Sequence, residues 1–212
     1  MLVALIGGTG SFGKGLAVRL TEKNDVLIGS RDHERARAKA SEFSALTGRT
    51  LAGNTNLAVA QQCDTAILTI PEALDSGFLE DLRGPLSGKL VISPIVPLYV
   101  KEGKFKHAFA SGSAAEKVAS ALPASRIAAA FHTLPAATLA ESGRVIDFDV
   151  PVCSNSKEVF DECAAVVSSI PGLRPLYAGT LSGARDVETL TPLLLNVAKL
   201  NHMKRLSIKL IG

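Results

Sequence analysis

The chain has 212 residues, of which 47% are hydrophobic and 20% are charged. This length and balance fit one domain, or one domain with a smaller appendage, and they exclude a disordered chain. The 23 Lys and Arg residues against 20 Asp and Glu give a net charge of +3, which is too small to indicate a nucleic-acid partner. No apolar run approaches the ~20 residues that a membrane helix needs, and we expect no membrane partner.

The three cysteines, Cys63, Cys153 and Cys163, are odd in number, widely spaced, and form no CxxC pair. Such spacing indicates free thiols in a reducing compartment. The apolar stretch 2–6 runs straight into glycine, which is not typical of a signal peptide. We therefore expect a cytoplasmic protein. The four histidines lack the spacing of metal ligands, so we expect no metal site.

Apolar runs bounded by glycine, proline or charged residues predict buried strands in the first two thirds of the chain. These runs cover residues 2–6, 25–28, 50–52, 64–70, 89–93 and 126–131. Helical spacing of apolar residues predicts helices over 11–23, 32–46, 72–82 and 113–122. Apolar strands that alternate with helices are typical of an α/β fold with a doubly wound, mostly parallel sheet of the Rossmann type. We assign this domain to residues 1–147.

Residues 148–212 are less regular, and we expect a smaller C-terminal α/β region packed on the first domain, where it helps to form a pocket for a second substrate. The pattern predicts a strand over 149–153, a helix over 157–169 and an extended segment over 173–177. A long helical stretch over 182–206 contains Pro192, which we expect to kink the helix or break it in two. Its apolar residues fit a core or a homodimer contact equally well.

The most informative motif is Gly8-Thr9-Gly10-Ser11-Phe12-Gly13. This GxGxxG follows a predicted strand and opens a predicted helix, as a dinucleotide-binding turn requires. Gly8 permits the tight turn, Gly10 the approach of the pyrophosphate, and Gly13 the close packing of the helix. The alternative is a plain glycine turn. A P-loop is excluded because Gly15 stands where the magnesium-binding Ser or Thr belongs.

The second predicted strand ends in Gly29-Ser30-Arg31, where an NAD-binding unit carries a carboxylate for the ribose hydroxyl. A hydroxyl and a guanidinium suit the 2′-phosphate of NADP instead. Arg35 lies one helical turn further and adds positive charge. The alternative, that these residues only solvate a helix face, is the better interpretation of Arg37 and Lys39.

The chain lacks several common catalytic signatures. Neither Tyr99 nor Tyr177 is followed by Lys at the fourth residue, so the Tyr–Lys pair of short-chain dehydrogenases is missing, and there is no GxSxG motif. His132 follows the predicted strand at 126–131, and the carboxyl ends of parallel strands are where ligands bind. We therefore take His132 as the candidate catalytic residue, against the alternative that it only shapes its loop. Two basic groups, at 101–107 and 199–209, indicate either a solubilising surface or steering of an anionic substrate.

These features together resemble the NADPH-dependent coenzyme F420 reductase family (F420H2:NADP oxidoreductases of archaea and actinobacteria). The resemblance covers nearly the whole chain and extends beyond the glycine turn. The residues that carry it are 3–10, 13–17, 29–31, 66–71, 93–97, 132–137, 149–153, 172–176 and 190–193.

The resemblance implies direct hydride transfer between nicotinamide C4 of NADP and C5 of the deazaflavin coenzyme F420. It also implies the roles of particular residues. Thr9, Gly10, Ser11 and Phe12 hold the phosphates, and Ser30, Arg31 and Arg35 the 2′-phosphate; Glu72 and Ser76 flank the adenosine or nicotinamide side; Leu98 and Ala136 contact cofactor near the transfer site; Leu206 lines the deazaflavin pocket. Arg35 departs from an expected Lys, and Glu72 from a bulkier apolar residue.

We therefore expect an NADP-dependent oxidoreductase whose partners are small redox cofactors. The alternatives are an NADPH-dependent reductase of a flavin or ferric chelate, and a non-catalytic NADP-binding protein. Turnover with F420, with FMN, or with neither acceptor distinguishes the three.

Overall fold

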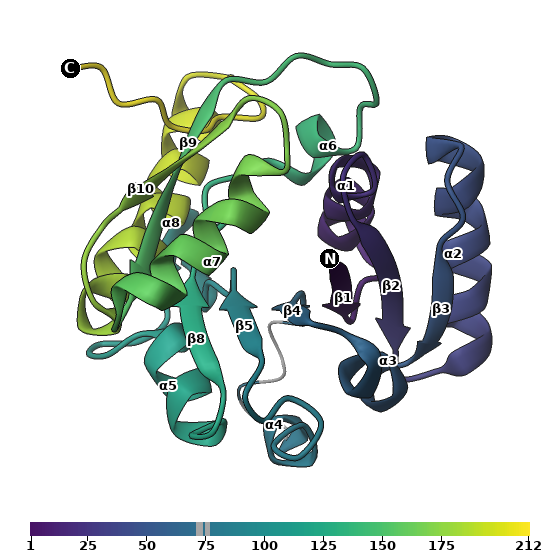
Figure 1. The fold of residues 1–212 in the computed structure, drawn as a ribbon. Coiled ribbons are helices and arrows are strands. Elements are labelled where there is room, and N and C mark those ends of the chain that lie inside the picture. The colour runs from purple at the N-terminus through teal and green to yellow at the C-terminus, as the bar shows by residue number, and fades with distance from the viewer. Residues whose placement is uncertain (71–73, 75–76) are drawn as a thin grey trace.

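The computed structural model describes residues 1–70, 74 and 77–212. They form an eight-stranded sheet in the order β10-β9-β8-β5-β4-β1-β2-β3 (Figure 1). The strands are β1 (Leu2–Ile6), β2 (Asp25–Ser30), β3 (Ala52–Thr55), β4 (Thr65–Leu68), β5 (Leu90–Ser93), β8 (Arg126–Ala129), β9 (Phe148–Ser154) and β10 (Leu173–Tyr177). Neighbours from β3 to β8 are parallel, whereas β9 is antiparallel to β8 and parallel to β10. The predicted α/β fold with a mostly parallel sheet is confirmed.

The strand order reverses between β1 and β4. The chain builds β2 and β3 on one side of β1 and then crosses to place β4, β5 and β8 on the other side. In such sheets, ligands bind in the crevice outside the carboxyl ends of the strands at the point of reversal. Ile6 pairs with Leu68 there, and Thr69 donates to the Ile6 carbonyl from both its N–H and its hydroxyl, at 2.9 and 2.8 Å.

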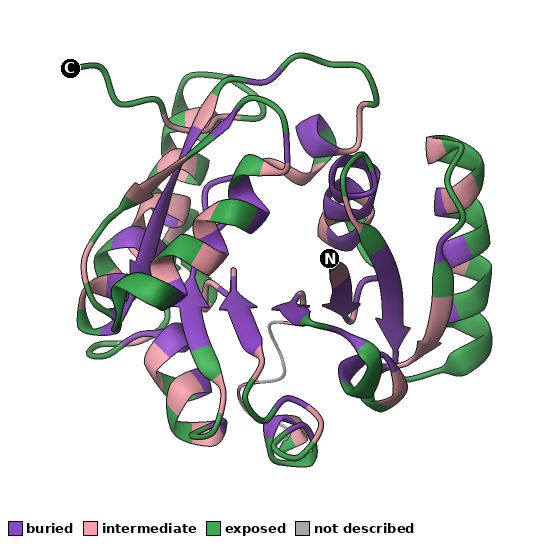
Figure 2. Cartoon of the chain, in the orientation of Figure 1, coloured by how far each residue is buried: buried purple, intermediate pink, exposed green. Residues whose placement is uncertain are grey.

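Helices cover both faces of the sheet. One face carries α1 (Ser11–Leu20), α2 (His33–Thr47), α6 (Ala136–Leu139) and α7 (Lys157–Ser168); the other carries α3 (Asn56–Gln62), α4 (Phe78–Asp81), α5 (Ala114–Ala121) and the first turns of α8 (Ala184–Leu200). Each face has its own apolar cluster, because the side chains of the strands alternate between the two faces. Figure 2 shows the strands largely buried and the exposed residues on the outer sides of the helices.

Several helices begin where their sequence supplies a capping oxygen. Asp32, Thr55, Ser113 and Ser156 each accept a hydrogen bond from the N–H three residues later, at 2.6 to 3.3 Å. These contacts satisfy backbone donors that a helix otherwise leaves free in its first turn. Helix α1, in contrast, has no side-chain cap.

Four features differ from the sequence-based expectations. Helix α3 and the hairpin of β6 (Leu98–Lys101) and β7 (Lys104–His107) were not predicted, and the predicted strand at 50–52 lies later, at β3. Helix α8 is not broken in two: it runs continuously through Pro192 and ends at Leu200 instead of residue 206. A proline removes one backbone donor from a helix, and Pro192 is itself buried, as are Ala184 and Val187 earlier in the same helix.

The region after residue 147 continues the same sheet, because β9 pairs with β8 and carries β10 on its outer side. The division into domains at residues 147 and 148 stays a prediction. Among the residues that the structure describes, no helix is both long enough and apolar enough to span a membrane.

Candidate functional site

The glycine motif forms a tight turn between β1 and α1. Gly7 adopts a left-handed conformation (φ 76°), and the Gly8 N–H donates to the Leu5 carbonyl at 3.0 Å. A Cβ atom at Gly13 would lie 2.2 Å from the Gly8 carbonyl oxygen, so the helix closes on the turn only with glycine there. The Gly7 N–H donates to Oδ1 of Asn56 at 2.9 Å. Asn56 starts α3, which was not predicted, and so this support of the turn was missed.

The turn presents a row of free backbone donors. Among the described residues, no acceptor meets the N–H groups of Thr9, Gly10, Ser11, Phe12 and Gly13. The first turn of α1 contains no acidic residue, and a Cβ atom at Gly10 would meet nothing within 4 Å. A helix N-terminus with open space and unpaired donors attracts an anion through its N–H groups and its dipole. The geometry therefore fits the pyrophosphate of a dinucleotide.

Ser30 and Arg31 lie at the carboxyl end of β2, beside this turn. Ser30 is buried, and its hydroxyl oxygen accepts from the Asp32 N–H at 3.3 Å, which leaves the hydroxyl proton free to be donated. The Asp32 carboxylate caps α2 by accepting from the Arg35 N–H at 2.6 Å. The Asp32 carboxylate, which follows Ser30 and Arg31 in the chain, is thus bound to the first turn of α2.

The basic residues of this segment fall into two kinds. Arg37 pairs with Glu34 at 3.8 Å and Lys39 with Glu42 at 2.6 Å, which agrees with their interpretation as a solvated helix face. Arg31 and Arg35 are exposed, and neither side chain has an ion-pair partner among the described residues. Two unpaired guanidinium groups near a buried hydroxyl fit a 2′-phosphate.

Two adjoining cavities lie at the carboxyl ends of the strands on the other side of the turn. We call the first the strand-end cavity; its volume is about 200 Å³. It is lined by Phe12, Leu68, Thr69, Pro94, Ile95, Val96, Phe131, His132, Leu134 and Thr191. Because Phe12 belongs to the first turn of α1, this cavity adjoins the phosphate turn.

The second, which we call the tail cavity, has a volume of about 250 Å³. It is lined by His132, Thr133, Leu134, Pro135, Ala136, Ala137, Thr191, Leu194, Leu195, Ala198, Arg205 and Leu206. His132, Leu134 and Thr191 line both cavities and form the wall between them. Flat apolar groups in the two cavities would therefore be neighbours.

Buried polar atoms without partners gather at these strand ends. Within the described part of the chain, the Ser93 hydroxyl, the Thr133 hydroxyl and both ring nitrogens of His132 have no hydrogen-bond partner. Such atoms are uncommon in native interiors and each costs about 1–3 kcal/mol. His132 and Thr133 line the tail cavity, where a polar ligand could satisfy them, whereas Ser93 lines neither cavity.

His132 is neutral at physiological pH. Burial, and to a smaller degree the charge of nearby His107, lower its pKa to about 3. Its backbone is held by the Thr191 hydroxyl, which donates to the His132 carbonyl at 2.8 Å. The preceding residue, Phe131, has a positive φ of 71°, a strained conformation for a bulky side chain.

Most of the predicted site residues come together at this edge of the sheet. Ala136 and Leu206 line the tail cavity with His132, and their contact with a cofactor stays a prediction. Leu98 begins β6, is 38% exposed and lines neither cavity. Glu72 and Ser76 lie outside the described residues. Sequence reasoning missed Thr191, which lines both cavities and holds the His132 backbone. Its one signal in the sequence was its place in the Leu-Thr-Pro-Leu motif at 190–193.

The predicted basic groups are less free than their sequence suggested. His107 is buried, with Nε2 2.9 Å from the Glu188 carboxylate. Lys199 donates to the Gly103 carbonyl at 2.6 Å, and Arg205 and Lys209 pair with Glu141 and Asp147. Steering of an anionic substrate by these groups stays a prediction.

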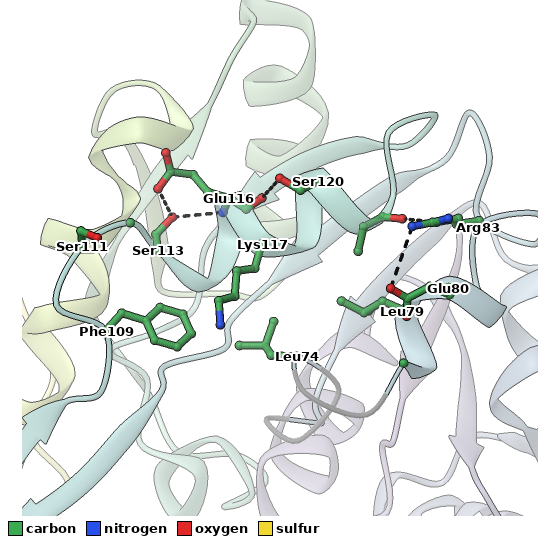
Figure 3. Close-up of a pocket in the computed structure, with 13 residues that line it drawn as sticks. Leu74, Leu79, Glu80, Arg83, Phe109, Ser111, Ser113, Glu116, Lys117 and Ser120 are labelled. Carbon is green, nitrogen blue, oxygen red and sulfur yellow. Dashed lines mark hydrogen bonds and ion pairs between the residues drawn. The ribbon is translucent and has the colours of Figure 1, made fainter.

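A larger cavity of about 670 Å³ lies between α4 and α5, on the face opposite α1 (Figure 3). Several of its polar groups already have partners: Ser113 bonds Glu116, and Arg83 donates to the Ala121 carbonyl at 2.7 Å. The Lys117 ammonium lies 4.0 Å from the centroid of the Phe109 ring. No described member of the predicted site lines this groove, so the strand ends remain the better candidate.

Known proteins resemble this chain over nearly its whole length. A family model for the NADP oxidoreductase, coenzyme F420-dependent, matches residues 2–97. An F420-dependent NADP reductase of Methanothermobacter thermautotrophicus is 34% identical over 99% of this chain and 94% of its own length. A protein with the same description from Methanocaldococcus jannaschii is 33% identical over 93% of this chain and 92% of its own.

Solved structures share the fold. A protein from Arthrobacter sp. FB24 matches 100% of this chain and 99% of its own with a TM-score of 0.81 at 20% identity. An imine reductase from Streptomyces aurantiacus matches 95% of this chain and 64% of its own with a TM-score of 0.64 at 19% identity. At these identities, the structural matches bear on the fold alone.

Proposed function

The chain belongs to the F420-dependent NADP reductase family, and we infer from this that its strand-end site transfers a hydride between NADP(H) and coenzyme F420. The protein is an NADP-dependent oxidoreductase. The observation that carries the assignment of the site is the pair of adjoining cavities that share the wall of His132, Leu134 and Thr191 beside the phosphate turn.

We propose that NADP binds along the carboxyl ends of β1 and β2. The free N–H groups from Thr9 to Gly13 would receive the pyrophosphate, and Ser30, Arg31 and Arg35 the 2′-phosphate. The strand-end cavity would then receive the nicotinamide, because Phe12 joins that cavity to the turn. The support is the agreement of open space, unpaired donors and unpaired guanidinium groups along one path.

The tail cavity would receive the deazaflavin, with Ala136 and Leu206 in its walls. When bound, the nicotinamide and deazaflavin rings supply the hydride donor and acceptor carbons, C4 and C5. The chain would orient the two rings, through the shared wall that lies between them, and would exclude water with apolar side chains. The C-terminal region 148–212 contributes α8 and the residues after it to this cavity, which supports its proposed role in binding the second substrate.

We propose that His132 acts at this wall as a neutral hydrogen-bonding group. A neutral imidazole offers one donor and one acceptor, and both ring nitrogens lack partners among the described residues. With a pKa of about 3, His132 does not carry a proton into the reaction at neutral pH. Its contribution is to hold a ring in place.

The test is turnover of purified protein with NADPH and F420, followed as loss of deazaflavin absorbance. Parallel reactions contain FMN or a ferric chelate in place of F420. We expect reduction of F420 at a rate well above that of either substitute. NADPH binding without turnover on any acceptor would overturn the assignment in favour of a binding protein, and preference for FMN or ferric chelate in favour of the other reductases.

Two further proposals concern the protein's surroundings. Leu193, Val197 and Leu200 are exposed at i, i+4 and i+7 spacing on α8, and we propose that this face forms a homodimer contact, tested by sedimentation of the wild type and of Leu200→Glu. Leu190 and Leu194 of α8 are partly buried, and Leu194 lines the tail cavity.

The three cysteines are buried and free, which supports a cytoplasmic location.

A further inference from the structure

The residues after α8 form one wall of the tail cavity without regular secondary structure. Helix α8 ends at Leu200, and Arg205 and Leu206 line the cavity from the segment that follows. We call residues 203–210 the C-terminal tail. Arg205 has a positive φ of 61°, a conformation that costs a non-glycine residue free energy. A strained turn of this kind persists only where contacts on both sides hold it.

On the far side of the turn, the contacts converge on Asp149. Its side chain is fully buried, and its two carboxylate oxygens accept from Nε and Nη2 of Arg174, both at 2.8 Å. The Leu210 N–H also donates to this carboxylate, at 2.5 Å, and Lys209 Nζ lies 3.7 Å from it. The Asp149 N–H donates to the Ile208 carbonyl at 2.9 Å, so backbone and side chain of one residue both hold the tail.

Arg174 binds both Asp149 and the C-terminal tail. It lies directly opposite Asp149 in the register of β9 and β10. While its guanidinium binds the carboxylate, its Nη2 also donates to the Leu210 carbonyl at 2.7 Å. Its hydrogen bonds, more than any other cause, lower the pKa of Asp149 to about 2, so the carboxylate is ionised throughout the usual assay range.

A second contact, at Glu141, is weaker. Glu141 lies just beyond α6 and pairs with both Arg144 and Arg205. Its side chain and those of both partners are 40 to 46% exposed. Exposed ion pairs contribute little to stability, whereas a buried charge with several hydrogen bonds contributes much more. Asp149 is therefore the contact that fixes the tail.

We propose that Asp149 is a positioning residue for the second substrate, because it anchors residues 208–210 and thereby keeps Leu206 in the wall of the tail cavity. This inference rests on the proposed function in one respect, namely that the tail cavity binds the deazaflavin. Asp149 itself lines neither cavity.

The first test compares Asp149→Asn with Asp147→Asn. Asp147 lies on the same segment and pairs with Lys209, but its side chain is 72% exposed. We expect Asp149→Asn to raise the KM for F420 about tenfold, because it removes charge-assisted hydrogen bonds to the tail, and to leave the kcat and the Kd for NADPH within about twofold. Asp147→Asn should behave as wild type.

A second readout does not depend on activity. Trypsin cleaves after Lys and Arg, and the tail contains Lys204, Arg205 and Lys209. A released tail should be cut faster at these residues in Asp149→Asn than in wild type, as measured by mass spectrometry of intact protein. If wild type shows no turnover with F420, the proposed function fails while this measurement still reports whether Asp149 holds the tail.

A third variant guards against misfolding of Asp149→Asn. Leu210→Pro removes the N–H that donates to Asp149 and leaves the carboxylate in place; Ile211→Pro, at a residue that is 97% exposed, is its control. Leu210→Pro should also raise the KM for F420. Combining Asp149→Asn with Leu210→Pro should raise this KM little more than either substitution alone. Unchanged cleavage, unchanged KM for F420, or an equal loss of NADPH binding would each overturn the proposal.

Discussion

The discrimination between NADPH and NADH should depend on Arg31. Its guanidinium is exposed at the end of β2 and has no ion-pair partner among the described residues, so Arg31→Ala removes no internal contact that they supply. A hydrogen bond to a charged group contributes about 1.5–3 kcal/mol, and solvent exposure favours the lower part of that range. Since 1.4 kcal/mol is a factor of ten, we expect an approximately 10- to 30-fold weaker Kd for NADPH.

Calorimetric titration of NADPH and NADH into wild type, Arg31→Ala and Arg37→Ala measures this effect. Arg37 is the matched control, because it is an arginine of the same segment whose charge is paired with Glu34. Arg31→Ala should weaken NADPH and leave NADH nearly unchanged, and the difference should shrink at high salt. Equal losses for both dinucleotides, or an equal effect of Arg37→Ala, would refute the assignment of the 2′-phosphate to Arg31.

Three further predictions concern the turn, the shared wall and the interior. Gly10→Ala should abolish NADPH binding in titrations, because the added Cβ blocks the approach of the pyrophosphate to the backbone. Its stability to urea should change little, because that Cβ meets no protein atom. Gly13→Ala should lower the free energy of unfolding by about 1–3 kcal/mol, because its Cβ clashes with the Gly8 carbonyl. The free energy of unfolding should fall as pH is lowered from 6.5 to about 3, because an unfolded chain protonates His132 in that window and the folded one does not; in His132→Asn, the decline should be shallower. Glu188→Ala should cost about 3–5 kcal/mol in urea unfolding, because the buried carboxylate accepts from His107 and two backbone N–H groups, and Glu188→Gln should cost less.

The geometry of the proposed nucleotide half of the site could be predicted because its causes are local. The turn needs glycine at fixed positions within one short segment, and the strands on either side are apolar enough to be identified by composition alone. Ser30 and Arg31 could be located because they stand at the end of the apolar run that forms β2. The sequence also favoured Arg37 and Lys39 as a solvated helix face, and the structure adds which carboxylates pair with them, namely Glu34 and Glu42.

The second half could not be predicted from pattern, because it is assembled from segments that are far apart in the chain. Residues near 132–137 meet Thr191 on α8 and Leu206 in the tail. The tail has no periodicity, and its position depends on Asp149, a buried charge whose partner Arg174 lies in another strand. Of the kink or break expected at Pro192, the break does not occur, because α8 runs continuously through that residue.

The two halves also differ in how their polar groups are satisfied. The phosphate turn presents backbone N–H groups that water can satisfy. At the shared wall and in the adjoining tail cavity, the ring of His132 and the hydroxyl of Thr133 are buried without partners among the described residues, at about 1–3 kcal/mol for each unsatisfied group. A ligand that satisfies even one of them recovers free energy that the fold alone has forgone. Stabilisation on binding should therefore be larger for the ring that reaches this wall than the buried apolar area of that ring implies.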